Sequence, residues 1–152
     1  MAYKARINDQ MSKTNPNLKR ILHLYNIDKP VGQGCVNKRE DVMLIQFMLK
    51  TEDTAFRGGA AVGNNIYGDV PMHGTLNLTT LGYLLMFQMR SREYGAPSGC
   101  IEPMDLNHLQ TAGGYLAKLN ANIMGNKADV FRDFSVAPGI PGALVPLLKG
   151  FD

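Results

Sequence analysis

The stretch that most constrains the fold is residues 30–50, PVGQGCVNKREDVMLIQFMLK, where a glycine-containing turn leads directly into an amphipathic run. Apolar residues recur in this run at helical spacing, as Val42, Ile45 and Leu49 show. Positions i, i+3 and i+7 share one face of a helix, so the segment predicts a helix with a wide apolar stripe that packs against a core. This pattern favours a mainly α protein.

A capping pattern marks the expected start of this helix. With Asn37 as the N-cap, Glu40 falls at the third helical position, where side chains and backbone amides can satisfy one another reciprocally. Asp41 adds negative charge in the first turn, where the helix dipole favours it. We therefore predict that Asn37 and Glu40 are structural capping residues.

Two further segments have the apolar spacing of helices. The first begins near Thr79 or Thr80 and runs to about Glu93, before a Gly- and Pro-containing turn. The second begins after Pro103 and reaches Leu119. A glycine pair inside this second segment weakens it by roughly 1 kcal/mol per residue relative to alanine, which predicts a kink or close helix packing there.

Three segments lack this periodicity. We predict an N-terminal arm over 1–29, a long Gly-rich loop over 51–74 and a Pro/Gly-rich C-terminal tail over 126–152. Within the arm, residues 18–27 are apolar enough for a helical turn or an edge strand, and prolines argue against a fourth long helix in the tail. The predicted fold is a compact three-helix bundle over 30–125, with extended N- and C-terminal segments.

Composition excludes several classes of protein. The 152 residues carry a formal net charge of +3, spread along the chain, which does not favour nucleic-acid binding. A membrane-spanning helix needs about 20 apolar residues, and the longest apolar run is much shorter. Because the first residues contain no apolar signal-peptide core, we expect a soluble protein that is cytoplasmic as synthesised, with any export following a route other than a classical signal peptide.

Residues that often ligate metals are few and scattered. The histidines His23, His73 and His108 do not stand at metal-ligand spacing, so we expect no metal site and no cofactor. Cys35 and Cys100 are not part of a CxxC motif. Two small, semi-buried thiols are the simpler interpretation, and one bridge remains open if their two loops meet.

The sequence likewise contains no pattern that predicts an enzyme. No thiol has an adjacent base in the sequence, and the glycine-rich loop lacks the lysine of a phosphate-binding loop. Neighbouring carboxylates such as Glu52 and Asp53 are interpreted as solvated. We therefore predict no catalytic residues.

The order of short motifs resembles that of peptidoglycan-binding-like domains, which occur in cell-wall hydrolases and in secretion-system spike and effector proteins. The pattern of that family begins with a Gly-containing turn, an Asn, an acidic pair, DV and a Gln. A DG turn and a Thr-led helix ending in FQ come next. A turn with DG-x-I-D-P and a last helix ending in LN complete the pattern. The matching positions, over about residues 30–121, are Gly32, Gly34, Asn37, Glu40, Asp41, Val42, Gln46, Leu49, Gly68 and Asp69 (in reversed order), Gly74, Thr79, Thr80, Phe87, Gln88, Gly99, Ile101, Pro103, Leu119 and Asn120.

The resemblance implies a non-catalytic role in one of three forms. The first is a structural or adaptor component of a bacterial contractile injection, secretion or phage-like assembly, with protein partners or a homo-oligomer. The second is a cell-wall module that binds peptidoglycan, for which the expected glycan-binding residues are Tyr67, His73, Arg90 and Tyr94. The third is an effector cargo or an immunity-type binding protein.

Overall fold

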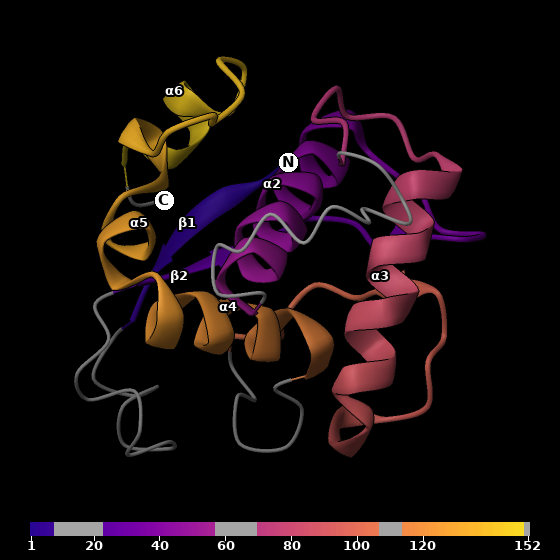
Figure 1. Cartoon of the computed structure of the whole chain (residues 1–152). Helices are drawn as coiled ribbons and strands as arrows, with labels where there is room; N and C mark the ends of the chain where they lie inside the picture. Colours follow the sequence, from indigo (N-terminus) through magenta and orange to yellow (C-terminus); the bar gives the residue numbers. More distant parts are fainter. Residues whose placement is uncertain (8–22, 57–69, 107–113, 151–152) are drawn as a thin grey trace.

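The computed structural model describes residues 1–7, 23–56, 70–106 and 114–150 (Figure 1). Within these ranges the protein is mainly α, with two small two-stranded sheets. The helices are α2 (Arg39–Phe56), α3 (Leu78–Arg90), α4 (Gly114–Asn126), α5 (Ala128–Arg132) and α6 (Val145–Leu148), and two single 3-10 turns are η2 (Arg92–Tyr94) and η3 (Phe134–Val136).

Both sheets join segments that are distant in sequence. Strand β1 (Tyr3–Arg6) pairs antiparallel with β2 (His23–Asn26), so that Tyr3 lies opposite Asn26. Strand β3 (Val31–Gly32) pairs antiparallel with β4 (Cys100–Ile101). The second pair connects the turn ahead of α2 to the segment that leads toward α4.

Helix α2 lies at the centre of the core. Its residues 41–49 are all buried, and both α3 and α4 pack against it (Figure 1). The predicted core positions Val42, Ile45 and Leu49 are at most 1% exposed. The amphipathic run therefore gave a correct prediction of a helix, but α2 is buried on more than one face.

The described parts of the expected arm and tail also contribute to this core. Residues 1–29 supply β1 and β2. Strand β2 lies within residues 18–27, for which the sequence allows either a helical turn or an edge strand, and the structure shows the strand. Tyr25 of β2 stacks on Phe134, with ring centroids 3.7 Å apart and an interplanar angle of 9°. Leu144 and Leu148, from the C-terminal region, are fully buried in the same core. The described parts of both segments thus pack on the core, the arm as strands and the tail mostly as short helical turns.

The hydrogen bonds of Asn37 differ from the predicted capping box. Helix α2 begins at Arg39, so Glu40 is its second residue rather than its third. Asn37 has a φ of 55°, and its side-chain oxygen accepts a hydrogen bond from the Gly32 N–H at 2.8 Å. Its side-chain nitrogen donates to the carbonyl oxygens of Gly32 and Cys35, each at 2.9 Å. Asn37 therefore holds the turn ahead of the helix.

The other two long helices differ from their predicted bounds, α3 at its start and α4 at its end. Asn77 caps α3, with its side-chain oxygen accepting from the Thr80 N–H at 2.8 Å. Helix α4 begins at Gly114, whose φ is 54°, and continues to Asn126, beyond the predicted end. Residues 107–113, the start of the predicted third helix, lie outside the described part, as do 57–69 of the predicted loop.

A buried amide of α2 holds the segment that precedes α3. The Gln46 side chain is fully buried, and its oxygen accepts a hydrogen bond from the Gly74 N–H at 3.0 Å. Its nitrogen donates to the Thr75 carbonyl oxygen at 3.0 Å and to the Thr80 hydroxyl at 2.9 Å. Gln46 therefore satisfies backbone groups that no regular secondary structure pairs.

Two more buried amides hold other segments in place. The Gln88 side chain accepts from the Gly99 N–H at 2.8 Å and donates to the Cys100 carbonyl oxygen at 2.7 Å. The Asn120 side chain accepts from the Tyr25 N–H and donates to the Tyr25 carbonyl oxygen, both at 2.9 Å. Three residues that match the family pattern, Gln46, Gln88 and Asn120, thus hold neighbouring segments in place through side-chain hydrogen bonds.

Cys35 and Cys100 form a disulfide, with their Cα atoms 6.7 Å apart. The bridge lies beside the β3–β4 pair, which brings the two loops together. The interpretation of these residues as two separate thiols is therefore wrong, and the alternative that had been left open is correct.

Candidate functional site

A polar pocket of about 250 Å³ lies where the C-terminal parts of three helices meet. Its lining consists of charged, amide and hydroxyl side chains from α2, from the end of α3 and from α4: Glu52, Arg90, Ser91, Lys118, Asn122 and Asn126. Pockets for drug-sized ligands are usually about 300–1,000 Å³. This one is therefore sized for a single sugar ring or a short side chain.

A partly buried ion pair forms one wall of this polar pocket. Glu52 is 3% exposed, and its Oε2 accepts a hydrogen bond from the Arg90 Nη2 at 2.7 Å. Its Oε1 accepts from the Asn122 Nδ2 at 3.1 Å. These charge-assisted hydrogen bonds compensate for the desolvation of the carboxylate. They also orient the Arg90 guanidinium at the pocket, and they correct the expectation that Glu52 is solvated.

A row of polar side chains on α4 forms the opposite wall. Lys118, Asn122 and Asn126 follow one another at four-residue spacing, so they lie along one face of the helix. The Asn126 Nδ2 donates to the Asn122 carbonyl oxygen at 2.9 Å. Each asparagine side chain carries both donors and acceptors, so the row can match a ligand that has both kinds of group.

An aromatic ring lies next to the pocket. The Lys118 Nζ is 5.5 Å from the centre of the Tyr94 ring, within the usual cation–π distance, and 3.3 Å from the Glu93 Oε1. A hydrogen bond from its own backbone N–H, together with Lys118, lowers the pKa of the Glu93 carboxyl. The Tyr94 side chain is 42% exposed. It therefore offers an apolar face beside hydrogen-bonding groups.

The structure brings together two of the four residues predicted to bind glycan. Arg90 lines the pocket, and the Tyr94 ring lies under the ammonium group of Lys118, which also lines it. His73 is exposed, accepts a hydrogen bond from the Thr75 N–H at 3.0 Å, and adjoins Gly74 near the first turn of α2. That position is roughly 20 Å along α2 from Glu52, at about 1.5 Å per residue, so His73 is not part of this site. Tyr67 lies outside the described residues.

Most of the pocket residues are not predicted by the sequence. Glu52, Lys118, Asn122 and Asn126 were not identified as site residues, because single polar residues on helices are usually solvated. One signal was available in α4. Its polar residues recur every four positions, on a different face from the buried Leu116, Leu119 and Ile123. A polar row beside an apolar stripe indicates a helix face that does not pack into the core.

The other described histidine, His23, belongs to the core. Its Nε2 donates to the Phe131 carbonyl oxygen at 3.1 Å, and its ring stacks on Phe131 with centroids 5.4 Å apart. Burial lowers the pKa of His23 below its usual 6.5, and Lys4 contributes in the same direction. The hydrogen bond and Asp133 oppose this effect. His23 is therefore a structural residue, well separated in sequence from every pocket residue.

Within the described ranges, no three His, Cys, Asp or Glu side chains are grouped so that they could hold a metal ion. The helices in those same ranges include none with the length and apolar character that a bilayer crossing requires. Comparison with protein-family models, with curated proteins and with solved structures gave no match.

Proposed function

We propose that this chain is a non-catalytic binding module and that its polar pocket holds a sugar ring of a peptidoglycan-type glycan. The observation that carries the proposal is the convergence of Arg90, Asn122 and Asn126 in a pocket of about 250 Å³ beside the Tyr94 ring. A sugar ring has an apolar C–H face and hydroxyl groups at its edge. The Tyr94 ring can pack on the apolar C–H face, and the asparagine side chains can bond to the hydroxyl groups.

The charges of the pocket support a glycan that also carries carboxylates. Wall glycans bear acetamido and carboxylate groups in addition to hydroxyls. Asparagine side chains can pair with an acetamido group, and Lys118, whose Nζ also lies 3.3 Å from the Glu93 Oε1, provides a cation that a ligand carboxylate can share. Because Glu52 is engaged by Arg90 and Asn122, we assign it a positioning role rather than an acid–base role.

The fold is compatible with this proposal. We infer that α2, α3 and α4 correspond to the three-helix frame of peptidoglycan-binding-like domains, with β1, β2 and the C-terminal helices as additions. Support comes from Gln46, Gln88 and Asn120, which match positions of the family pattern and all satisfy backbone groups of neighbouring segments. These residues maintain the arrangement of the three helices, whereas the proposed ligand contacts come from the pocket residues.

The disulfide supports a place of action outside the cytoplasm. Disulfides persist in oxidising compartments and are rare where glutathione and thioredoxin keep thiols reduced. The Cys35–Cys100 bridge therefore favours the periplasm, the cell surface or the exterior as the working location. This is where a wall-binding module would meet its ligand.

The test is co-sedimentation of the purified, oxidised protein with purified peptidoglycan. We expect the wild-type chain to sediment with the wall, and the double variant Tyr94→Ala/Asn126→Ala to lose most of that retention. Both residues are exposed, so their replacement spares the core. Arg90→Gln is a poorer test, because it removes a cation that is hydrogen-bonded to the buried Glu52 carboxylate.

Lys149→Gln and Val136→Ala serve as matched controls, since both residues are exposed and neither lines the pocket. They should sediment like the wild type. Wall binding through this pocket is refuted if the wild type stays in the supernatant, or if the double variant sediments as well as the controls do.

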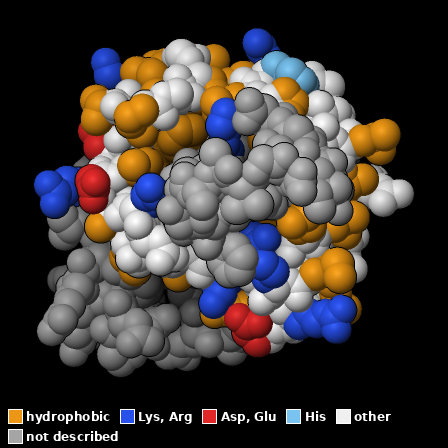
Figure 2. All heavy atoms as spheres, viewed as in Figure 1, with side chains coloured by type: hydrophobic (Ala, Val, Ile, Leu, Met, Phe, Trp, Pro, Cys, Tyr) orange, Lys and Arg blue, Asp and Glu red, His pale blue; other side chains and the backbone are white. Residues whose placement is uncertain are grey.

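A second candidate function is the structural or adaptor role in a contractile injection or secretion assembly. The observation that favours it is the apolar surface of α3, where Leu78 is 86% exposed and Met89 is 54% exposed. Figure 2 shows hydrophobic side chains on the surface over this helix. If the chain assembles through α3, light scattering will show an oligomer that Leu78→Ser/Met89→Ser dissociates. A monomer at all concentrations would exclude self-assembly through this face.

A further inference from the structure

One ammonium group of the polar pocket is held between a carboxylate and an aromatic ring. Lys118 lines the pocket from α4, and its Nζ lies 3.3 Å from the Glu93 Oε1 and 5.5 Å from the centre of the Tyr94 ring. Both partners belong to η2, which packs against α4. The pocket wall includes Lys118 but not Glu93. The ion pair therefore lies at the edge of the pocket, with the cation on the pocket side.

The two members of this ion pair differ in exposure. The Lys118 side chain is 28% exposed, whereas the Glu93 side chain is 56% exposed. An exposed carboxylate that leaves its partner becomes hydrated, and such ion pairs contribute little to stability, so the separation costs little. Lys118 would keep its cation–π contact with the Tyr94 ring throughout. Lys118 is therefore the member that stays in place, and Glu93 is the member that a ligand carboxylate can displace.

The ion pair on the other wall of the pocket is not exchangeable in this way. The Glu52 side chain is 4% exposed and accepts hydrogen bonds from Arg90 at 2.7 Å and from Asn122 at 3.1 Å. A ligand carboxylate that took Arg90 from Glu52 would remove a charge-assisted hydrogen bond from a buried carboxylate, which is costly. Of the two cations in the described lining, Lys118 is therefore the one that an anionic ligand engages at the lower cost.

We propose that the polar pocket takes an N-acetyl sugar that carries its own carboxylate, and that Glu93 sets the selectivity for it by yielding Lys118 to that carboxylate. This inference rests on the glycan-binding function proposed above and specifies the ligand. A pocket of about 250 Å³ holds one ring, so the carboxylate belongs to the bound sugar itself. Asn122 and Asn126 follow Lys118 by about one and two turns of α4, which places amides for the acetamido group beside the cation.

Titration of the isotope-labelled, oxidised full chain, followed by two-dimensional NMR, tests this inference. The probes are N-acetylmuramic acid and its carboxamide, which has the same ring without the charge. We expect both to shift the side-chain amide signals of Asn122 and Asn126 saturably, with the acid binding roughly twofold more tightly. Glu93→Gln should raise the affinity for the acid by about twofold to fivefold and leave the affinity for the carboxamide unchanged, because Lys118 then has no carboxylate to give up. Lys118→Gln should abolish the preference for the acid.

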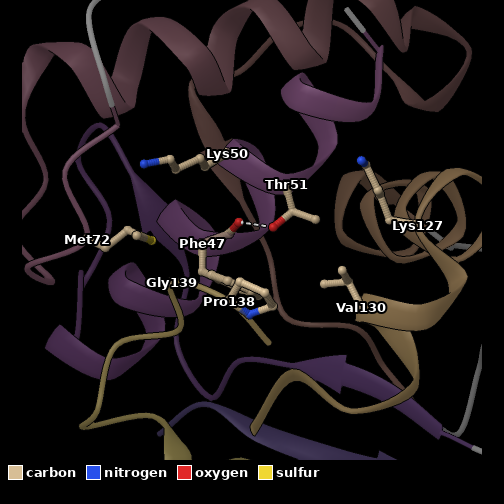
Figure 3. Close-up of a pocket in the computed structure, with 8 residues that line it drawn as sticks. All are labelled: Phe47, Lys50, Thr51, Met72, Lys127, Val130, Pro138 and Gly139. Atoms are coloured by element: carbon tan, nitrogen blue, oxygen red, sulfur yellow. Dashed lines mark hydrogen bonds between the residues drawn. The ribbon is translucent and has the colours of Figure 1, made fainter. Parts of the chain in front are cut away.

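Two variants serve as matched controls. Glu102→Gln removes the same charge as Glu93→Gln, from an exposed position that does not line the pocket. Lys127→Gln removes the same charge as Lys118→Gln at the position directly after Asn126, but Lys127 lines a separate pocket that shares no residue with the polar one (Figure 3). Both controls should keep the wild-type affinities for the acid and the carboxamide.

The outcomes separate this inference from the proposed function. Saturable binding of both sugars with no gain in acid affinity for Glu93→Gln overturns the selectivity role and leaves glycan binding intact. An equal gain for Glu102→Gln also overturns it, because net charge would then explain the effect. Absence of saturable shifts with either sugar refutes glycan binding in the pocket as well. Tighter binding of N-acetylmuramoyl-L-alanine than of the acid would place the carboxylate on an attached peptide and overturn its assignment to the sugar.

Discussion

Replacing Asn120 by alanine should remove a large fraction of the stability of this protein. The Asn120 side chain satisfies both backbone groups of Tyr25, whose side chain and main chain are fully buried. It also donates to the Leu116 carbonyl oxygen at 2.9 Å, but that oxygen keeps its α-helical partner. In the Asn120→Ala variant, the Tyr25 N–H and carbonyl groups therefore both lose their partner in a region without access to water.

The magnitude follows from these two groups. A buried backbone group left without a partner costs about 1–3 kcal/mol, so two cost about 2–6 kcal/mol. Alanine recovers roughly 0.5 kcal/mol through its higher helix propensity. We expect a net loss of about 4 kcal/mol, compared with the roughly 5–15 kcal/mol that typically stabilises a whole domain.

The assay is equilibrium urea unfolding of the oxidised protein, followed by far-ultraviolet circular dichroism. Asn126→Ala is the matched control, because it is the same substitution on an exposed position of the same helix. The control should change the free energy of unfolding by less than about 1 kcal/mol. A loss below about 1 kcal/mol for Asn120→Ala as well would refute the argument that this amide replaces backbone pairing.

Three other predictions concern stability. Replacing Cys35 and Cys100 together by serine should cost about 4 kcal/mol in urea unfolding, from the entropy of closing a loop whose ends are 65 residues apart; an unchanged midpoint would contradict this. Gly32→Ala should cost at least about 2 kcal/mol, because its φ is 143° and a Cβ there would lie 2.0 Å from the carbonyl oxygen of the residue before β4. Gly34→Ala, with a φ of 73° and open space around it, should cost only about 1 kcal/mol, and equal losses would refute the steric argument. Burial lowers the pKa of folded His23, so the unfolded chain binds a proton more readily than the folded one. The free energy of unfolding should therefore fall as the pH drops below about 6.5, and His23→Phe should flatten that dependence in unfolding curves measured across this pH range.

The long helices could be predicted from the sequence because their cause is local. Apolar spacing at 42, 45 and 49 places three side chains on one face whatever the rest of the chain does. The start of α2 was harder to predict. An asparagine amide bonds equally well to backbone groups before or after it, and only the folded turn shows that Asn37 bonds to Gly32 and Cys35.

The polar pocket and the disulfide depend on contacts between distant segments. Glu52 and Arg90 are 38 positions apart, and nothing in the local pattern of either residue indicates the other. The burial of Phe134 and Leu148 was also missed. Prolines around them argue correctly against a long helix, but short helical turns can still place apolar side chains in a core formed by α2.

The covalent link between positions 35 and 100 has a consequence for the integrity of the chain. Every peptide bond between these positions lies inside a closed ring, so a single protease cut there produces two pieces that remain joined. Cleaved molecules would keep their apparent size on a gel until a reductant separated them. In an oxidising compartment that contains proteases, such a ring would hold a nicked molecule together as one covalent unit.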